Sequence, residues 1–474
     1  GEAESSDPTT DCDDDDGTRY PTAPEICGDG IVDQDCDGDE EECSLTDLGL
    51  LNADTKLSGS SASDEVGDSV LMADLTGDGN LDLLVGATDL DTVYMVTGPS
   101  TSDVTLATGA DETFTGDDTT GFALASAGDI NNDGYEDVLM GAYLNNSGDT
   151  NAGTAYLLLG PSTGGALSSV ADVTFNGEVA QQRVGISLAG AGDQNGDGRD
   201  DFLIGAERGD ESGFDDNGAA YLIFGSASPS GSMDLPADAD AILWGEADSD
   251  GAGRSVSTAG DVDGDGTPDV LVGAYYESTN ANNAGAAYLV YGPVTTDSSL
   301  GDGSVFYGAA ANDFAGHAVT DAGDTNDDGY DDILVGAYGA DEAYLFLGQA
   351  SSLSGDDLAN ADAVFSGEAN NDRFGYSVSA GGNLNGDDND DVLIAADKAE
   401  SNDGELYVYY GPFAGAIAAT TADVVFVGQN LGRAGTSLDG GQDYNNDGFH
   451  DIMVGSNAAD SDYGAAYLIL GTWE

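Results

Sequence analysis

A nine-residue pattern, Asp-x-[Asp/Asn/Thr]-x-Asp-Gly-x-x-Asp, recurs seven times along the chain and limits its fold more than any other feature. The copies follow one another at intervals of 55 to 68 residues and begin at Asp74, Asp129, Asp193, Asp261, Asp324, Asn383 and Asp443. Each copy leads into an aliphatic stretch that ends in Gly-Ala or a close equivalent. A regular period of this length indicates an array of one repeated structural unit.

The spacing within each copy predicts a metal-binding loop. In the second copy, which runs from Asp129 to Asp137, oxygen-bearing side chains stand at positions 1, 3, 5 and 9. These side chains can converge on one hard cation, the main-chain carbonyl of position 7 can add a ligand, and Gly134 permits the sharp turn between them. Several carboxylates on a flexible all-oxygen loop favour Ca²⁺ over Mg²⁺, which prefers a smaller octahedral cage.

The positions that would hold the cation are the same in all seven copies, and position 7 would contribute its carbonyl. In chain order they are Asp74, Thr76, Asp78, Asn80 and Asp82; Asp129, Asn131, Asp133, Tyr135 and Asp137; Asp193, Asn195, Asp197, Arg199 and Asp201; Asp261, Asp263, Asp265, Thr267 and Asp269; Asp324, Asn326, Asp328, Tyr330 and Asp332; Asn383, Asn385, Asp387, Asn389 and Asp391; and Asp443, Asn445, Asp447, Phe449 and Asp451.

The sixth copy departs from the pattern at two positions. Asn383 replaces the first Asp, and Asp388 stands where the other copies have glycine. If the turn needs a positive φ, Asp388 carries a backbone cost that glycine avoids. We therefore expect the sixth site to be the weakest.

Two other interpretations of the loops are possible. Asp, Asn and Gly also favour solvated turns that bind no metal, although a register of four oxygens in every copy argues against this. An EF-hand would need a twelve-residue loop ending in Glu and flanked by helices, whereas these loops end in Asp and enter short strands.

The rest of each unit is as regular as its loop. Runs of four to seven residues bounded by Gly, Asp and Asn predict four strands in each unit. The third strand carries a tyrosine in every copy: Tyr94, Tyr156, Tyr221, Tyr288, Tyr344, Tyr407 and Tyr467. A tyrosine in the same place in every unit indicates packing within the sheet rather than a binding stripe. Seven such units predict an all-β, seven-bladed β-propeller of four-stranded blades.

These motifs resemble the FG-GAP repeats that form the seven-bladed propeller of integrin alpha subunits and of many secreted bacterial proteins. The resemblance covers about residues 54 to 474. It implies that the metal loop joins the first and second strands of each blade, on the face opposite the usual ligand surface. This chain departs from the family pattern because Ala or Val often replaces Phe in the first motif and proline is absent from the GAP position.

The ends of the repeat array predict how the ring closes. The seventh unit ends at residues 466–474, before any fourth strand, whereas residues 54–59 resemble that missing strand. We expect residues 54–59 to pair with residues 465–470, because such pairing removes the exposed edge that an open sheet would present.

Residues 1–45 form a predicted separate module, joined to the propeller by a linker at residues 46–53. The module contains all four cysteines, Cys12, Cys27, Cys36 and Cys43. An even cysteine number in a short acidic segment suggests two disulfides, with three possible connectivities. Zinc is the competing interpretation, but no histidine lies nearby and no Cys-x₂₋₄-Cys pair is present.

A further Ca²⁺ loop is predicted within this module, with the ligands Asp33, Asp35, Asp37, Asp39 and Glu41. The stretch resembles a Cys- and Asp-rich metal-binding motif of myxobacterial and related secreted proteins. The alternative is a disordered acidic tail.

The charge of the chain restricts its partners. With 91 acidic and 9 basic residues, the formal net charge is −82. Seven or eight Ca²⁺ ions would cancel only about 14 to 16 of these charges. The remaining acidic surface would repel nucleic acid and anionic membranes, and it suits a high-salt environment in which charges are screened. A halophilic or marine source is therefore a hypothesis.

Several sequence features favour an extracellular bacterial protein that binds rather than catalyses. The chain starts at Gly1, which suggests removal of a signal peptide, and it has no run of 18 apolar residues. Its two histidines, His317 and His450, lie inside repeats without a nucleophile that the sequence can place, so we predict no catalytic residues and no cofactor other than six to eight Ca²⁺ ions.

Two non-enzymatic functions remain. One is cell-surface adhesion or binding of a protein or glycan ligand, through the long loops between second and third strands at about residues 143–153, 207–217 and 275–284. The other is a structural subunit of an extracellular filament or sheath, which self-associates through the N-terminal segment.

Overall fold

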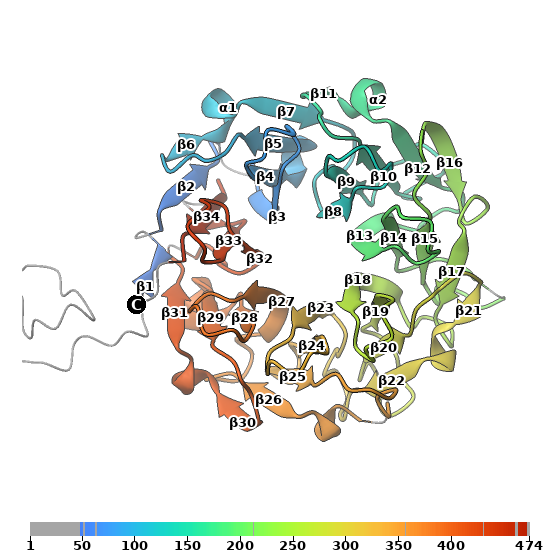
Figure 1. Cartoon of the computed structure of the whole chain (residues 1–474), viewed down its shortest axis with the longest axis vertical. Coiled ribbons are helices and arrows are strands. Elements are labelled where there is room, and N and C mark those ends of the chain that lie inside the picture. Colours follow the sequence, from blue (N-terminus) through green and yellow to red (C-terminus); the bar gives the residue numbers. More distant parts are fainter. Residues whose placement is uncertain are drawn as a thin grey trace, which may run out of the picture.

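The computed structural model of the chain describes residues 48–50, 53–61, 64–211, 213–355, 357–429, 431–459 and 463–471. Within these residues, seven β-sheets stand around a central axis (Figure 1). The prediction of an all-β, seven-bladed propeller is confirmed. The N-terminal module, with its four cysteines and its predicted Ca²⁺ loop from Asp33 to Glu41, lies outside the described residues.

Each blade is an antiparallel meander of four strands, numbered here from the axis outwards. The first strands are β3 (Val66–Ala73), β8 (Leu124–Gly128), β13 (Val184–Gly192), β18 (Ala252–Gly260), β23 (Ala318–Gly323), β27 (Phe374–Gly382) and β32 (Ser437–Gln442). The second strands are β4 (Asp82–Ala87), β9 (Asp137–Ala142), β14 (Asp201–Ala206), β19 (Asp269–Ala274), β24 (Asp332–Ala337), β28 (Asp391–Ala396) and β33 (Asp451–Ser456).

The outer half of each blade repeats just as closely. The third strands are β5 (Thr92–Val96), β10 (Thr154–Leu158), β15 (Ala219–Ile223), β20 (Ala286–Val290), β25 (Glu342–Phe346), β29 (Glu405–Tyr409) and β34 (Ala465–Ile469). The fourth strands are β7 (Glu112–Thr115), β12 (Val173–Gly177), β17 (Ala241–Trp244), β22 (Ser304–Tyr307), β26 (Ala363–Ser366), β31 (Val424–Val427) and, in the seventh blade, β2 (Thr55–Ser58).

The hydrophobic core lies between neighbouring blades. Every residue of each second strand is buried, because both faces of that strand pack against an adjacent blade. One cluster, for example, combines Leu84 and Phe114 of the first blade with Met140 and Tyr156 of the second. The tyrosines of the third strands are all buried, with exposures of 0 to 8%. This burial supports packing as their role.

Short rim strands tie each blade to the next, a feature that the sequence did not reveal. The connection between third and fourth strands pairs in parallel with the outer strand of the preceding blade. These strands are β6 (Val104–Thr105), β11 (Gly165–Ala166), β16 (Gly231–Leu235), β21 (Ser298–Ser299) and β30 (Gly415–Ala418). Single helical turns follow four of them: α1 (Leu106–Gly109), α2 (Leu167–Val170), η3 (Leu300–Asp302) and η5 (Ala419–Thr421). A further turn, η4 (Leu358–Asn360), precedes β26, whereas η2 (Thr88–Leu90) and α3 (Ala399–Asn402) follow the second strands β4 and β28.

The N-terminal end of the described chain lies against the seventh and sixth blades (Figure 1). Strand β2 pairs antiparallel with β34, with Thr55 opposite Leu468 and Ser58 opposite Ala465. Asp54 Oδ2 accepts a hydrogen bond from the Leu470 amide at 2.8 Å. Asp111 makes the equivalent bond to the Thr97 amide in the first blade, at 3.0 Å.

A further rim strand, β1 (Leu48–Gly49), falls in the range expected to be a linker. It pairs in parallel with β31, and the following Leu50 is only 2% exposed. This stretch therefore takes the same place at the rim as the connections within the other blades. Among the described residues, no helix has the length and apolar character needed to cross a membrane.

Candidate metal centres

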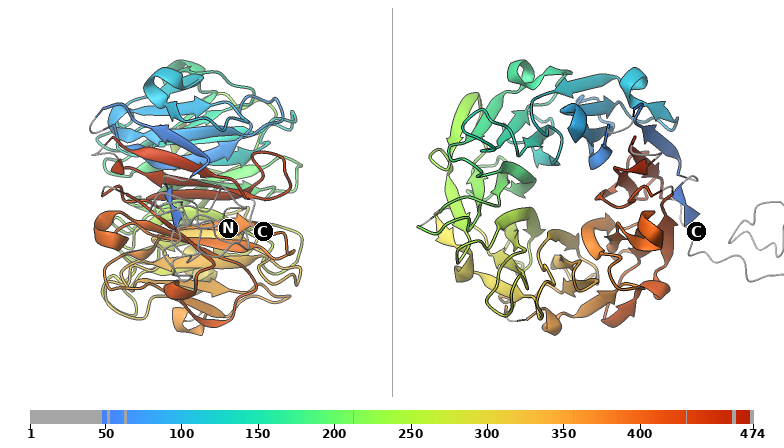
Figure 2. Two further views of the ribbon diagram at one scale, coloured as in Figure 1. Left: turned by 90° about the vertical axis from the view of Figure 1, so that its left-hand side faces the viewer. Right: turned by 180° about the vertical axis from the view of Figure 1, so that it is seen from behind.

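The seven Asp-rich loops lie on one face of the propeller. Each loop joins the first strand of a blade to the second, as residues 74–82 join β3 to β4. Because these strands are antiparallel and every blade has the same orientation around the axis, all seven loops stand at the same end of the propeller, which Figure 2 shows edge-on in its left-hand view. The structure thus brings all the predicted loop residues to one face, and the five predicted positions of each loop into one turn.

The position-1 carboxylate organises each loop. In the second loop, Asp129 Oδ1 accepts a hydrogen bond from the Asp133 amide at 3.0 Å, and Oδ2 accepts one from the Gly134 amide at 2.9 Å. The same pair of bonds recurs at Asp74, Asp193, Asp261, Asp324 and Asp443. These amides fix the carboxylate beside the side chains of positions 3 and 5.

The turn requires left-handed backbone at two positions. Position 6 has φ between 81° and 96° in all seven loops, and Asp388 adopts 81° where the others have glycine. A non-glycine residue in this conformation costs about 1 kcal/mol. Position 4 has φ between 56° and 77°, and Gly, Asn or Asp occupies it in every loop. The sequence shows that Gly, Asn or Asp occupies position 4, but only the structure shows the reason, which is the left-handed backbone.

The sixth loop also lacks one of the organising bonds. The Asn383 amide has a single oxygen, and this oxygen accepts bonds from the amides of Gly386 and Asp387. Since its other terminal atom is a nitrogen, it cannot accept the position-6 bond that the carboxylates make. Both departures noted in the sequence therefore have a structural consequence at this loop.

The position-9 carboxylate is buried and engaged by the backbone. Asp137 accepts hydrogen bonds from the amides of Ile130 and Gly160, at 3.0 and 2.9 Å. Equivalent pairs hold the other six, so position 9 joins its loop to the end of the third strand. Burial raises the pKa of Asp137 to about 7, and the nearby carboxylates of Asp133 and Asp129 add to the rise.

The donor atoms at positions 1, 3 and 5 fit a hard cation. In the fourth loop, the carboxylates of Asp261, Asp263 and Asp265 all lie within 4.8 Å of one another. In the second and fifth loops, position 3 supplies Asn131 Oδ1 and Asn326 Oδ1, which are buried without a hydrogen-bond partner among the described residues. A buried oxygen with no donor is costly unless something else binds it. Asp269, at position 9, is not part of the three-carboxylate group.

A second ring of contacts, missed in the sequence, links neighbouring loops. The position-8 side chain of one loop accepts a hydrogen bond from the position-1 amide of the preceding loop: Glu136 from Asp74, Asp200 from Asp129, Asp331 from Asp261, Asp390 from Asp324, and His450 from Asn383. His450 accepts through Nδ1 at 2.9 Å, so this nitrogen carries no proton. The sequence offered one signal for these contacts, a polar residue at position 8. Five loops have such a residue, whereas Leu81 and Pro268 occupy position 8 in the first and fourth loops.

Comparisons with known proteins agree with this repeat. The profile of the FG-GAP repeat matches residues 120–158, 252–290 and 374–409. The chain contains FG-GAP repeats. Each matched segment spans the first three strands of a blade together with its loop, in the second, fourth and sixth blades.

The relatives include integrin alpha subunits. Human integrin alpha-7 is 34% identical over 165 residues, which are 33% of this chain and 13% of the relative. Integrin alpha pat-2 of Caenorhabditis briggsae is 30% identical over 242 residues, 44% of this chain and 18% of the relative. Mouse integrin alpha-8 is 29% identical over 247 residues, 50% of this chain and 21% of the relative. The chain therefore spans about a fifth or less of the curated relatives it matches.

Among solved structures, virginiamycin B lyase of Staphylococcus aureus aligns with 88% of this chain and 98% of its own, at 8% identity and a TM-score of 0.48. A score this low supports no inference about the function of the chain.

Proposed function

We propose that this chain is a secreted, Ca²⁺-binding propeller that binds a protein or glycan ligand in cell-surface adhesion. The observation that carries the proposal is the set of loops on one face, in which amide-fixed carboxylates stand beside further side-chain oxygens; in two loops these include a buried Asn oxygen without a hydrogen-bond partner among the described residues. A cation in each loop would be held at positions 1, 3 and 5, with position 9 and the position-7 carbonyl close by. The similarity to integrin alpha subunits supports a binding role.

The Ca²⁺ would act mainly on stability. Each loop gathers several carboxylates at a turn, where their mutual repulsion opposes folding unless a cation offsets it. Because the donor atoms come together only in the folded blade, binding free energy adds to folding free energy. The ions would stiffen the metal face, while the opposite face would remain available for a ligand.

Calcium stoichiometry tests the metal part of this proposal. The full chain, freed of metal by a chelator and returned to millimolar Ca²⁺, should retain six to eight ions per chain after equilibrium dialysis. Mg²⁺ should compete poorly because it requires a small, near-ideal octahedral shell and gives up its water ligands reluctantly. A content of fewer than about two ions per chain would contradict the proposal.

A second candidate function is that of a subunit in an extracellular filament or sheath. The arrangement of the outer strand favours it: β2 pairs with β34, and more than 400 residues separate the bonded pair Asp54 and Leu470. A strand so distant in sequence can be donated to a neighbouring copy instead of its own ring. Light scattering and electron microscopy in millimolar Ca²⁺ distinguish the two functions, because a filament subunit forms ordered fibres and a ligand-binding propeller stays monodisperse.

The proposed location is the outside of a bacterial cell. Extracellular Ca²⁺ is millimolar and can fill weak sites, and an oxidising environment would let the four cysteines form disulfides.

A further inference from the structure

Basic residues gather on the face opposite the metal loops. The first strands begin and the second strands end on that face, about 20 Å from the loops along a six-residue strand. Of the nine Lys and Arg residues in the chain, six stand at these strand ends: Arg183, Arg208, Arg254, Arg373, Lys398 and Arg433. We call this surface the arginine face, defined by these six residues.

Four of the arginines form two similar clusters, three blades apart. In one, Arg183 contacts the carboxylate of Glu207, and Arg254 Nε lies 3.8 Å from Glu207 Oε2. In the other, Arg373 Nη1 lies 3.3 Å and Arg433 Nε 3.0 Å from Asp397 Oδ2. Both carboxylates are buried, at 4% and 0% exposure. Each acid therefore holds one arginine from its own blade and one from the next.

Each cluster also carries a cation without an acidic partner. Arg208 follows Glu207 in the chain, and Lys398 follows Asp397. Neither forms an ion pair with another residue in the described part of the chain. The chain has about ten acidic residues for every basic one, so acidic partners are abundant elsewhere. Asp216 and Asp341 line the cavities beside Arg208 and Lys398, so three cations stand near two carboxylates and each cluster has a local formal charge of +1 within a chain of net charge −82.

Aromatic rings hold the guanidinium groups in place. Arg183 lies 5.7 Å from the centre of the Tyr143 ring, and Arg254 lies 5.8 Å from that of Tyr275. Arg373 lies 5.1 Å from the Tyr376 ring. Contacts of this kind orient a guanidinium without neutralising it. The paired arginines are therefore held in place by both a carboxylate and a ring, whereas Arg208 and Lys398 are the cations available to an added anion.

His317 lies at the centre of the arginine face and is neutral. Its Nδ1 donates to the Tyr376 carbonyl oxygen at 3.1 Å, so Nε2 can accept the bond from Arg254 Nη2 at 3.2 Å. Burial and the charge of Arg254 lower the pKa of this imidazole. Asp68 also lines the centre, and its carboxylate accepts a bond from Asn457 Nδ2 at 2.8 Å.

Three arginines occupy backbone that favours glycine. Arg183, Arg373 and Arg433 have φ of 64°, 62° and 54°, and the fourth blade has Gly251, at φ 68°, in the same place. The corresponding residue has a positive φ in all seven blades, from 48° at Glu65 to 68° at Gly251, so this conformation belongs to the repeat itself. Moreover, Arg183 Nε and Asn457 Oδ1 are buried without a hydrogen-bond partner among the described residues.

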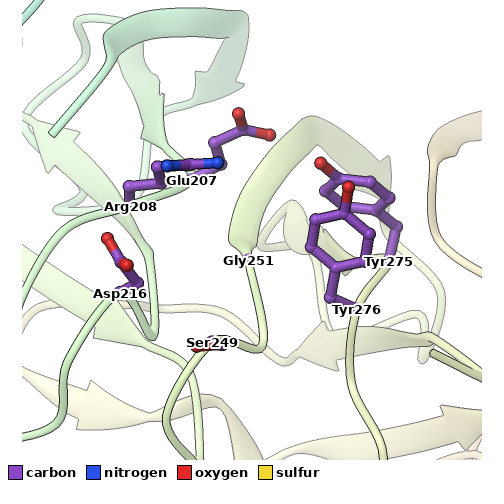
Figure 3. Close-up of a pocket in the computed structure, with 7 residues that line it drawn as sticks. All are labelled: Glu207, Arg208, Asp216, Ser249, Gly251, Tyr275 and Tyr276. Carbon is purple, nitrogen blue, oxygen red and sulfur yellow. The ribbon is translucent and has the colours of Figure 1, made fainter. Parts of the chain in front are cut away.

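Three cavities open between these side chains, and each combines a cation with an aromatic ring. Arg208, Asp216, Tyr275 and Tyr276 line a cavity of about 130 Å³, in which the two rings lie on the other side of the connecting segment at Gly251 from Arg208 (Figure 3). Arg254 and Arg433 line a central cavity of about 230 Å³ beside Tyr376. A third cavity, of about 300 Å³, is lined by Lys398, Arg373, Phe314 and Tyr338.

We propose that the arginine face binds an acidic saccharide, whose carboxylate or sulfate groups pair with Arg208 and Lys398 and whose sugar rings lie against the tyrosines. This inference rests on the proposed ligand-binding function and assigns it a ligand class. An acidic peptide would use the cations alone, whereas a charged sugar uses both the cations and the flat aromatic surfaces beside them. Widely spaced charges on the sugar suit the face better than a dense polyanion, because the surrounding surface is acidic.

The test is isothermal titration calorimetry on the full chain in millimolar Ca²⁺. The probes are an oligosaccharide of alternating glucuronate and neutral sugars, its fully neutral analogue, and a short oligoglutamate peptide. Arg208→Gln and Lys398→Gln each remove one charge without breaking an ion pair, so both variants should fold. Lys56→Gln, in β2 at the outer rim, removes the same charge away from the face and is the matched control. Circular dichroism melting establishes that all variants are folded.

The expected result is binding of the acidic oligosaccharide, weakened about tenfold by R208Q and by K398Q and unchanged by K56Q. Equal binding of acidic and neutral saccharides, insensitive to R208Q and K398Q, would overturn the inference and leave the ligand-binding function standing. Binding of the peptide alone would overturn the saccharide assignment. Failure of the folded, Ca²⁺-loaded chain to bind any probe would also overturn it, and fibre formation in the same sample would show that the ligand-binding function itself had failed.

Discussion

At the scale of single residues, the loops show how one backbone conformation selects its side chains. Six loops place glycine at position 6, where φ is strongly positive, and the sixth loop places Asp388 there. Its carboxylate adds negative charge to a loop whose position-1 residue, Asn383, has lost one. These two changes offset each other in charge but not in backbone conformation.

Replacing Asp388 with glycine should therefore stabilise the chain. We expect Asp388→Gly to raise the free energy of unfolding by about 1 kcal/mol, because glycine adopts this φ without strain. Chemical denaturation in saturating Ca²⁺ measures the change. The matched control is Gly448→Asp in the seventh loop, where a Cβ would meet no atom within 4 Å and only the backbone cost remains. The explanation fails if D388G lowers the free energy of unfolding or if G448D leaves it unchanged.

A half-buried carboxyl away from the loops gives the chain a pH dependence. Asp439 in β32 accepts a hydrogen bond from the Met72 amide, and burial raises its pKa to about 7. The pKa of Asp439 in the folded state lies above the unfolded value of 3.8. The carboxyl therefore contributes fully to the free energy of unfolding below pH 4, and this contribution is lost as the pH rises towards 7.

Asp439→Asn should remove this part of the pH dependence. The amide copies the neutral carboxyl, so at pH 8 the variant should be more stable than the parent by about 2 kcal/mol, and the two should converge near pH 4. Urea denaturation at several pH values in saturating Ca²⁺ measures the difference. A constant difference across this range would show that Asp439 does not titrate as described.

At the scale of elements, periodicity in the sequence was enough to predict the strands and their number per blade, and the resemblance to FG-GAP repeats implied the place of the loops between first and second strands. The rim strands were not predictable, because strands such as β11 and β21 are only two residues long and have no sequence pattern of their own. The position-8 contacts and the arginine face were hidden for a different reason. Their members, such as Arg183 and Arg254, are single residues in different repeats, and only the register of the blades shows that they meet.

The outer strand of the seventh blade gives a direct test at this scale. Leu57 of β2 is fully buried, and β2 satisfies backbone groups of β34 that would otherwise form an open edge. A chain that lacks residues 1–60 should melt several degrees below a chain that lacks only residues 1–46, which keeps β1 and β2. Scanning calorimetry of both chains in Ca²⁺ makes the comparison. Equal melting temperatures would show that these strands contribute nothing to the ring.

At the scale of the whole molecule, the basic residues are unevenly distributed between the two faces. The metal loops concentrate carboxylates on one face, and six of nine basic residues stand on the other. The sequence predicted the overall excess of negative charge but not this division, since composition carries no information about position. An excess of this size makes stability depend on screening.

Lowering the salt concentration should therefore destabilise the chain even when Ca²⁺ is saturating. The screening length grows from about 3 Å at 1 M salt to about 30 Å at 0.01 M, so repulsion among the acidic residues extends across whole blades. We expect the melting temperature to fall by many degrees over this range. Replacing NaCl by an equal osmolality of sucrose controls for excluded-solute effects, and a melting temperature independent of salt would contradict the expectation.

The central claim is that the loops bind Ca²⁺ and that this binding stabilises the propeller. Thermal unfolding of the full chain with and without Ca²⁺, at constant high salt, tests it most directly. A site at a hundred times its dissociation constant contributes about 2.7 kcal/mol, so several filled loops should raise the melting temperature by well over ten degrees, and Mg²⁺ should raise it much less. A melting temperature that is the same in Ca²⁺ and in a chelator would contradict the claim.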